Sequence, residues 1–158
     1  MCERCESRRP SWSEYFMTNA KLAAMRSQDP STKVGCAIVK DNKLVSIGYN
    51  GFPSGLDFTW EKNGGLDSKY WYIVHAEANA LINAENLSNL KGATVYVTLF
   101  PCNECAKLLV QAGIKKVVYA SDKYWDQDSF KASRQILTAA GIDLEEYSER
   151  DFEISEIH

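Results

Sequence analysis

Apolar residues three and four positions apart predict a first helix near the start of the chain. The helix begins at the capping box formed by Ser11 and Glu14, and the pattern stops at Asp29-Pro30. Its apolar positions are Trp12, Phe16, Ala20 and Ala23. Residues 1–10 before it are polar and charged, which is typical of a mobile tail.

The spacing of the next segments is that of strands. Residues 34–40 are nearly all apolar and rich in β-branched side chains, as expected of a strand buried on both faces. Asp41-Asn42 predicts a tight turn into a second strand, 43–49, so the two strands form a hairpin. The connection from residue 51 to residue 73 is rich in Gly, Pro and aromatic residues, and connections this long inside a compact domain are usually functional.

The second half of the chain alternates helices and strands. We expect helices over 75–84, from Pro101 to Gly113, and over 127–140, with strands at 93–98, 116–120 and 142–144. This order predicts parallel neighbouring strands with right-handed crossovers, and hence an α/β sheet that begins with the hairpin. The domain is expected to span 11–147. Residues 148–158 are expected to form an acidic tail that is solvated or faces a partner.

Composition narrows the class of protein. A chain of 158 residues with 45% hydrophobic and 25% charged residues is expected to form one ordinary globular domain. It has no apolar run long enough to span a membrane and no secretion signal, so we expect a cytoplasmic protein without a membrane partner. Five cysteines fit a reducing compartment better than a disulfide framework. The net charge of −3 argues against a broad nucleic-acid surface and favours a small substrate.

Two short segments carry candidate metal ligands and a candidate base. The first contains His75 and Glu77, and the second contains Pro101, Cys102 and Cys105. One imidazole and two thiols suit Zn²⁺ and leave the fourth tetrahedral position free for water, as in catalytic sites. The two cysteines lie on one face of a helix whose N-terminus favours thiolates, so both are expected to lose their protons readily. Glu77 then remains as the catalytic base.

Each of these features alone has a simpler interpretation. A histidine before an alanine-rich helix is usually a core residue, a Cys-x-x-Cys pair is often redox-active or structural, and a glutamate in a first turn complements the helix dipole. Together, however, H-x-E followed by P-C-x-x-C is the signature of zinc nucleobase deaminases. Such a site requires two helix N-termini, distant in sequence, to converge on one ion.

Flanking segments make the likeness more specific. Between about residues 12 and 147, the chain resembles the deoxycytidylate deaminase family within the cytidine deaminase superfamily. The segments that carry this resemblance are 26–30, 34–35, 48–51, 75–80, 99–107 and 121–124. Bacterial tRNA adenosine deaminases share the zinc residues, but Asn79 and the segment 122–124 are closer to the nucleotide enzymes.

The resemblance implies a three-layer fold, in which helices flank a five-stranded mixed sheet, and the hydrolysis of dCMP to dUMP, which supplies thymidylate synthesis. It also implies one catalytic Zn²⁺ per subunit, a homohexamer, activation by dCTP with Mg²⁺ and inhibition by dTTP. The alternatives are an enzyme that accepts both dCMP and dCTP, a polynucleotide deaminase of the tRNA type, and a nucleotide sensor without activity. Glu77 argues against the sensor, because a structural zinc needs no base beside it.

Several further residues are candidates for contacts with the substrate. Asn50 is expected to bind the deoxyribose hydroxyl, unless it only tolerates the turn beside Gly51. The backbone of Ala76, Leu99 and Phe100 is expected at the base edge, with the Phe100 ring as an apolar wall. The candidates for the 5′-phosphate are Arg26, Lys123 and Tyr124. Arg26 has an alternative role at the end of the first helix, and Lys123 as a solvated loop charge.

The connection 51–73 and the chain termini carry the remaining candidates. A regulatory triphosphate pocket is predicted at Lys62, Asn63, Gly64 and Lys69, and the alternative is a loop that packs against a neighbouring subunit. Cys2 and Cys5 form a second Cys-x-x-Cys pair, and a second zinc there would need Cys36 or His158 as a further ligand.

Overall fold

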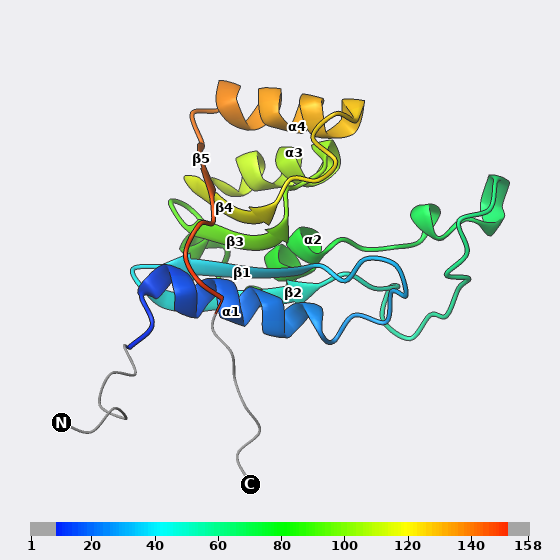
Figure 1. Ribbon diagram of the computed structural model, residues 1–158, viewed down its shortest axis with the longest axis horizontal. Helices are drawn as coiled ribbons and strands as arrows, with labels where there is room; N and C mark the ends of the chain where they lie inside the picture. Colours follow the sequence, from blue (N-terminus) through cyan, green and yellow to red (C-terminus); the bar gives the residue numbers. More distant parts are fainter. Residues whose placement is uncertain (1–8, 152–158) are drawn as a thin grey trace, which may run out of the picture.

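The computed structural model describes residues 9–151 and places a five-stranded sheet between helices (Figure 1). The helices are α1 (Trp12–Ala24), α2 (Ala76–Asn83), α3 (Asn103–Ala112) and α4 (Asp128–Ala139). The strands are β1 (Gly35–Lys40), β2 (Lys43–Tyr49), β3 (Thr94–Leu99), β4 (Lys116–Ser121) and β5 (Asp143–Glu146). Short 3₁₀ helices are η2 (Gly65–Asp67), η3 (Lys69–Trp71) and η4 (Leu87–Asn89).

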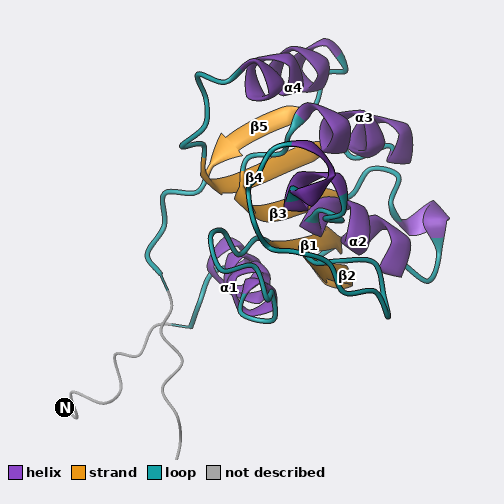
Figure 2. Cartoon of the chain, turned by 90° about the vertical axis from the view of Figure 1, so that its right-hand side faces the viewer, coloured by secondary structure: helices purple, strands orange, loops and turns teal. Residues whose placement is uncertain are grey.

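The sheet is mixed, and its strand order is β2-β1-β3-β4-β5. Strand β1 pairs antiparallel with both β2 and β3, whereas β3, β4 and β5 are parallel. Helix α1 covers one face, α2 and α3 cover the other, and α4 packs beside α3 and β5 (Figure 2). The predicted fold class, a five-stranded mixed sheet flanked by helices that starts with a hairpin, is confirmed.

Strand β1 is buried on both faces, as its sequence predicted. Cys36 and Ile38 belong to the core cluster under α2 and α3, while Ala37 and Val39 belong to the cluster under α1. This alternation places a continuous hydrophobic core on each side of the central strands. The central sheet is therefore a rigid support for the loops at its ends.

Gly48 allows α2 to lie directly against β2. A Cβ atom at this position would stand 2.4 Å from the Ala80 nitrogen and 2.5 Å from the Ala76 oxygen, both of which are backbone atoms. Because backbone atoms cannot rotate away as a side chain does, any other residue must push α2 off the sheet. The helix that starts at Ala76 depends on this contact for its position.

We expect Gly48→Ala to lower the free energy of unfolding by about 3 kcal/mol or more, the upper part of the range for overpacking. Urea unfolding followed by circular dichroism measures this change. Gly64→Ala is the matched control, because a Cβ atom at Gly64 would meet nothing within 4 Å. Equal unfolding midpoints for the two variants would show that α2 does not rest on Gly48.

The connection between β2 and α2, residues 51–74, is called the insertion below and projects from the body of the molecule (Figure 1). An isolated bridge between Gly51 and Val74 closes its base. Aromatic side chains stack within it, with ring centroids 4.1 Å apart for Phe52 and Trp60 and 4.2 Å apart for Phe58 and Tyr72. These stacks and the two 3₁₀ helices give the insertion a defined structure despite its length.

The first residues of the predicted acidic tail contact the protein. Arg150 pairs with the buried carboxylate of Glu14 at 3.2 Å, and Asp151 pairs with Lys21, both on α1. Residues 149–151 stay exposed to solvent, as the sequence predicted for this segment, while their side chains also bond to α1 and to its N-cap Ser11. The rest of that tail, most of the N-terminal tail, and the candidate ligands Cys2, Cys5 and His158 lie outside the described residues.

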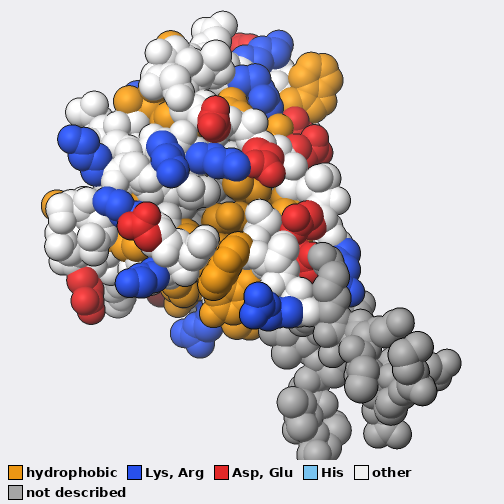
Figure 3. All heavy atoms as spheres, turned by 90° about the vertical axis from the view of Figure 1, so that its left-hand side faces the viewer, with side chains coloured by type: hydrophobic (Ala, Val, Ile, Leu, Met, Phe, Trp, Pro, Cys, Tyr) orange, Lys and Arg blue, Asp and Glu red, His pale blue; other side chains and the backbone are white. Residues whose placement is uncertain are grey.

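Charged side chains of both signs are interspersed on the face shown in Figure 3, which carries no large area of positive charge. This agrees with the small net negative charge of the chain. Among residues 9–151, no helix combines the length and the apolar character needed to cross a membrane.

Candidate metal centre

The N-termini of α2 and α3 meet at one end of the sheet. His75 is the N-cap residue of α2, and Cys102 is the N-cap residue of α3, with Cys105 in the first turn of α3. Neither residue uses its side chain for an N-cap hydrogen bond, so the imidazole and the thiol can both face the space between the two helices. The two segments are separated by β3, whose last residue leads into Phe100-Pro101.

The distances between the three side chains match a zinc site. Nδ1 of His75 lies 3.3 Å from Sγ of Cys102 and 3.5 Å from Sγ of Cys105, and the three atoms lie within 4.8 Å of one another. With Zn–N of about 2.1 Å and Zn–S of about 2.3 Å, a tetrahedral zinc separates nitrogen from sulfur by roughly 3.6 Å. One imidazole and two thiols at these distances therefore fit Zn²⁺.

The two thiols differ in acidity. Hydrogen bonds from the Cys105 thiol and from His75 lower the pKa of Cys102 to about 4. The pKa of Cys105 is raised, first because its proton is held by the neighbouring Cys102 sulfur and second because it is buried. Of the two sulfurs, Cys102 is therefore the more acidic, and Cys105 holds the shared proton. Because a coordinated thiol is deprotonated, metal binding releases the second proton.

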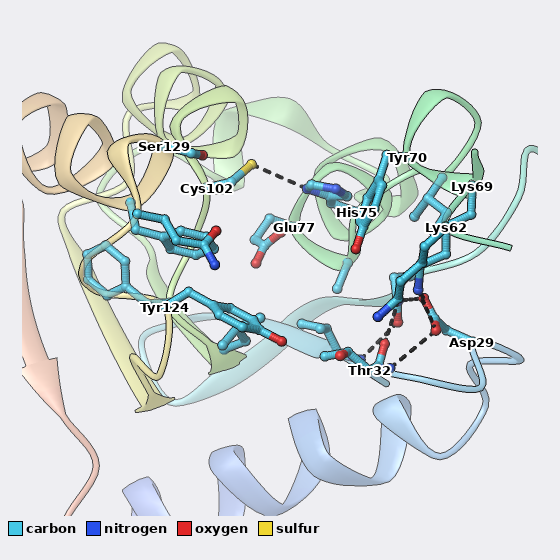
Figure 4. Close-up of a pocket in the computed structure, with 18 residues that line it drawn as sticks. Asp29, Thr32, Lys62, Lys69, Tyr70, His75, Glu77, Cys102, Tyr124 and Ser129 are labelled. Carbon is cyan, nitrogen blue, oxygen red and sulfur yellow. Dashed lines mark hydrogen bonds and ion pairs between the residues drawn. The ribbon is translucent and has the colours of Figure 1, made fainter. Parts of the chain in front are cut away.

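Glu77 lies in the first turn of α2 and points into the same cavity (Figure 4). Its side chain is 4% exposed, and this burial raises the pKa of the carboxyl, while the charge of His75 opposes the rise. A carboxyl group with a raised pKa exchanges protons more readily near neutral pH than an exposed one. The position and the acidity of Glu77 both suit a general acid and base.

A cavity of about 470 Å³ opens in front of these groups. Its walls come from the loop before β1, the insertion, the start of α2, the end of β3 and the segment before α4. The lining residues are Asp29, Thr32, Val34, Asn50, Lys62, Lys69, Tyr70, Ile73, His75, Ala76, Glu77, Leu99, Phe100, Cys102, Tyr124, Gln127, Ser129 and Phe130. This size is typical of pockets for small ligands.

The predicted substrate contacts divide into two groups. Those that line the cavity are Asn50, Ala76, Leu99, Phe100 and Tyr124. Arg26 and Lys123 are not among the lining residues. The Arg26 guanidinium lies 5.8 Å from the centre of the Tyr49 ring, and the Lys123 ammonium lies 5.1 Å from the centre of the Tyr124 ring. Of the three phosphate candidates, only Tyr124 therefore faces the cavity.

Asn50 holds the wall of the cavity through its side chain. Its Oδ1 accepts from the Val34 backbone at 2.8 Å, and its Nδ2 donates to the Thr32 carbonyl at 2.9 Å and weakly to Asp29 at 3.5 Å. Because both amide hydrogens are used, the side chain can only accept from a ligand, through the second lone pair of Oδ1. If Asn50 binds the deoxyribose hydroxyl as the sequence predicts, Oδ1 accepts the hydrogen bond from that hydroxyl.

The residues predicted for a regulatory pocket are also divided. Lys62 and Lys69 line the cavity that contains Glu77, whereas Asn63 and Gly64 do not. The ammonium of Lys69 is buried against the carboxylate of Asp29, with Nζ–O distances of 2.7 and 2.8 Å. The four residues therefore do not form one separate pocket. From the sequence, Asp29 was expected to stop the first helix and belonged to the segment 26–30 that carries the resemblance, but no local signal indicated its partner.

Cys36 is fully buried in the core cluster under α2 and α3, and burial raises the pKa of its thiol well above the usual value. Cys36 lies on β1, between β2 and β3, and its side chain packs among core residues on that face. The suggestion that Cys36 completes a second zinc site with the N-terminal cysteines is thus not supported.

Three comparisons relate the chain to known proteins. Residues 10–121 match the model of the cytidine and deoxycytidylate deaminase zinc-binding region. The chain is 49% identical to the deoxycytidylate deaminase of Homo sapiens, over 86% of this chain and 79% of that protein. It is 47% identical to a probable deoxycytidylate deaminase of Drosophila melanogaster, over 86% of this chain and 72% of that protein.

A solved structure shares the fold. The dCMP deaminase from the cyanophage S-TIM5, crystallised in complex with dCMP and dUMP, matches with a TM-score of 0.74 and 29% identity. The match covers 89% of this chain and 99% of that one.

Proposed function

The chain belongs to the cytidine and deoxycytidylate deaminase family, and on this premise we propose that it hydrolyses dCMP to dUMP and ammonia. One observation carries the proposal. The side chains of His75, Cys102 and Cys105 converge in a cavity that also receives the buried carboxyl of Glu77. The cyanophage dCMP deaminase bound to dCMP and dUMP supports the choice of substrate, because it shares the fold at 29% identity.

We assign Zn²⁺ to His75, Cys102 and Cys105, in agreement with their distances and donor types. When bound, the ion supplies Lewis acidity that lowers the pKa of water to near neutrality. His75 and Cys102 each cap a helix, so the backbone of α2 and α3 fixes the direction of both donors.

Glu77 moves the protons of the reaction. Its carboxylate removes a proton from the attacking water and delivers it to N3 of the cytosine ring, which makes C4 electrophilic. A C–O bond then forms at C4. Glu77 then takes the proton of the new C4 hydroxyl and passes it to the amino group, so that the C–N bond breaks as the C4=O double bond forms, and ammonia leaves. Phe100, which is 2% exposed and lines the cavity, supplies an apolar wall for the ring.

We assign the 5′-phosphate to Lys62 and Tyr124, in place of the Arg26 and Lys123 that the sequence suggested. Lys62 is an exposed residue of the insertion, and Tyr124 follows β4 on another wall of the same cavity. A hydrogen bond from Thr32 lowers the pKa of the Tyr124 hydroxyl, and the charges of Lys123 and Lys62 add to this effect. Lys62 and Tyr124 line the same cavity, where both groups can contact one anion.

We expect Lys62→Met to reduce the preference for dCMP over deoxycytidine about tenfold, since an exposed charge-assisted hydrogen bond is lost. The measurement is kcat/KM on both substrates, followed spectrophotometrically, with CMP and dCTP assayed in parallel. Lys123→Met is assayed beside it, because Lys123 acts on the Tyr124 hydroxyl although it lies outside the lining of the cavity. A loss of preference in that variant alone would return the phosphate to Lys123. Lys43→Met is the matched control, because Lys43 is an exposed lysine of β2 that does not line the cavity. Failure of the unmodified protein to act on dCMP would refute the proposed function.

We extend the proposal to assembly and regulation. Large apolar side chains are exposed on α2 and on η4, where Ile82 is 76% exposed and Leu87 is 72% exposed. Exposed apolar residues of this kind support a homo-oligomer, a hexamer by resemblance to the family. By the same resemblance, we propose that dCTP with Mg²⁺ activates the protein and that dTTP inhibits it. We also propose that the protein is located in the cytoplasm. Sedimentation velocity with and without dCTP and Mg²⁺ tests the assembly and the effect of the nucleotide.

A further inference from the structure

The wall of the cavity contains a buried ion pair. Lys69 and Asp29 are each 3% exposed, and the ammonium bonds both carboxylate oxygens. Asp29 also accepts from the backbone nitrogens of Ser31 at 2.8 Å and Thr32 at 3.2 Å. Taking two charges out of water is costly, and apolar residues of the same volume would often stabilise the fold as well. Stability alone therefore does not explain why this ion pair is present, and a functional role would explain it.

The pair joins two segments that are far apart in sequence. Asp29 belongs to the loop between α1 and β1, which is fixed to the sheet, whereas Lys69 belongs to η3 in the insertion. The backbone nitrogen of Lys69 donates to the Glu61 carbonyl at 2.8 Å, and Lys62 forms a bridge with Ser68. The strand-like segment that carries Lys62 is thus tied to Lys69, and through Lys69 to Asp29.

The same carboxylate also reaches the opposite side of the cavity. Asp29 accepts from the backbone nitrogen of Thr32, and the Tyr124 hydroxyl is directed toward Thr32 (Figure 4). One buried acidic group thereby fixes a basic side chain on the insertion and a hydroxyl beyond β4. Figure 4 shows Asp29 and Thr32 side by side, with Lys69 above Asp29 and Tyr124 directed toward Thr32.

We propose that the Asp29–Lys69 ion pair is a positioning pair, which holds Lys62 and Tyr124 at the spacing that selects a substrate carrying a 5′-phosphate. This inference rests on the proposed function. Lys69 itself is a poor phosphate ligand, because its charge is compensated by Asp29 and its side chain is buried. Lys62 has no ion pair among the described residues, so it keeps its charge for the ligand.

The test replaces both members of the pair. In Asp29→Asn/Lys69→Met no buried charge is left without a partner, and the asparagine oxygen can still accept from Ser31 and Thr32. We expect the preference for dCMP over deoxycytidine, as a ratio of kcat/KM values, to fall roughly tenfold. The loss should lie in KM for dCMP, with zinc content and kcat on deoxycytidine within about twofold of the unmodified protein. Lys116→Met/Glu145→Gln, which removes an ion pair between β4 and β5, is the control and should keep the ratio.

A double-mutant cycle with Lys62→Met makes the test specific. If the pair acts through Lys62, the ratio falls no further when the pair is replaced in the Lys62→Met background. Lys69→Arg, which keeps both charges but lengthens the donor, is assayed in the same way if the double variant does not fold, with a smaller fall expected. An unchanged ratio in a folded variant, or an equal loss on both substrates, overturns the positioning role. If the unmodified protein shows no preference for dCMP over deoxycytidine, the proposed function is wrong, and the positioning role of the ion pair is wrong with it.

Discussion

Glu77→Gln is expected to lower kcat on dCMP by about 10²- to 10⁴-fold, the range for loss of acid–base catalysis, while the protein keeps its zinc. Glutamine has nearly the same shape as glutamate, so it can occupy the buried site in the first turn of α2 without a charge. It cannot accept a proton from water or pass one to the ring and the amino group. KM should change much less than kcat, because Glu77 acts on the reacting atoms.

Glu104→Gln is the matched control for this experiment. Glu104 also lies in the first turn of a helix beside the metal centre, but its side chain is 70% exposed and pairs with Lys107 on the surface. The control should keep both its zinc and its turnover. Two outcomes would contradict the assignment of Glu77: a variant that loses zinc yet is as active as the unmodified protein, or one whose kcat equals that of the control.

The parts of the fold and the site that the sequence predicted are those that local chemistry determines. Asp41 and Asn42 adopt φ angles of 52° and 57°, which suit a tight hairpin turn and set the pairing of Lys40 with Lys43 next to it. His75 and Cys102 stand at helix starts because Pro101 and the alanine-rich run after His75 locate those starts. The proximity of these two helix starts could be predicted only because the combined motif requires both to bind one ion.

The polar half of the cavity could not be predicted in the same way. Nothing in the residues around Lys69 indicates that its ammonium is buried against a carboxylate forty positions earlier in the chain. Arg26 and Lys62 look alike in the sequence as free cations, and only the path of the insertion decides that Lys62 faces the cavity. Long connections are shaped by tertiary contacts rather than by periodic patterns, so their charged residues are the least predictable part of a site.

Cys105→Ala should lose bound zinc and, with it, deamination. Cys105 is 2% exposed, and its sulfur is one of only three ligand atoms that converge at the centre among the described residues. The loss of zinc affinity should exceed the about 10- to 100-fold that removal of a hydrogen bond to a ligand costs in zinc enzymes. Metal content by mass spectrometry and turnover of dCMP are measured on the same preparation, because the two should fall together.

The variant Cys36→Ala is the control for Cys105→Ala, because it shows what the loss of a buried thiol does when that thiol is not a metal ligand. Both cysteines are buried, but Cys36 belongs to the core of β1 and is not part of the cluster of candidate ligands. Its replacement removes one sulfur atom from the core and should lower stability modestly, with one zinc per chain retained. Removal of zinc from the unmodified protein by a chelator should abolish activity, and added Zn²⁺ should restore it, whereas Cys105→Ala should stay inactive. If Cys36→Ala lost the metal and Cys105→Ala kept it, the ion would have to be placed elsewhere, and Glu77 would no longer stand beside it.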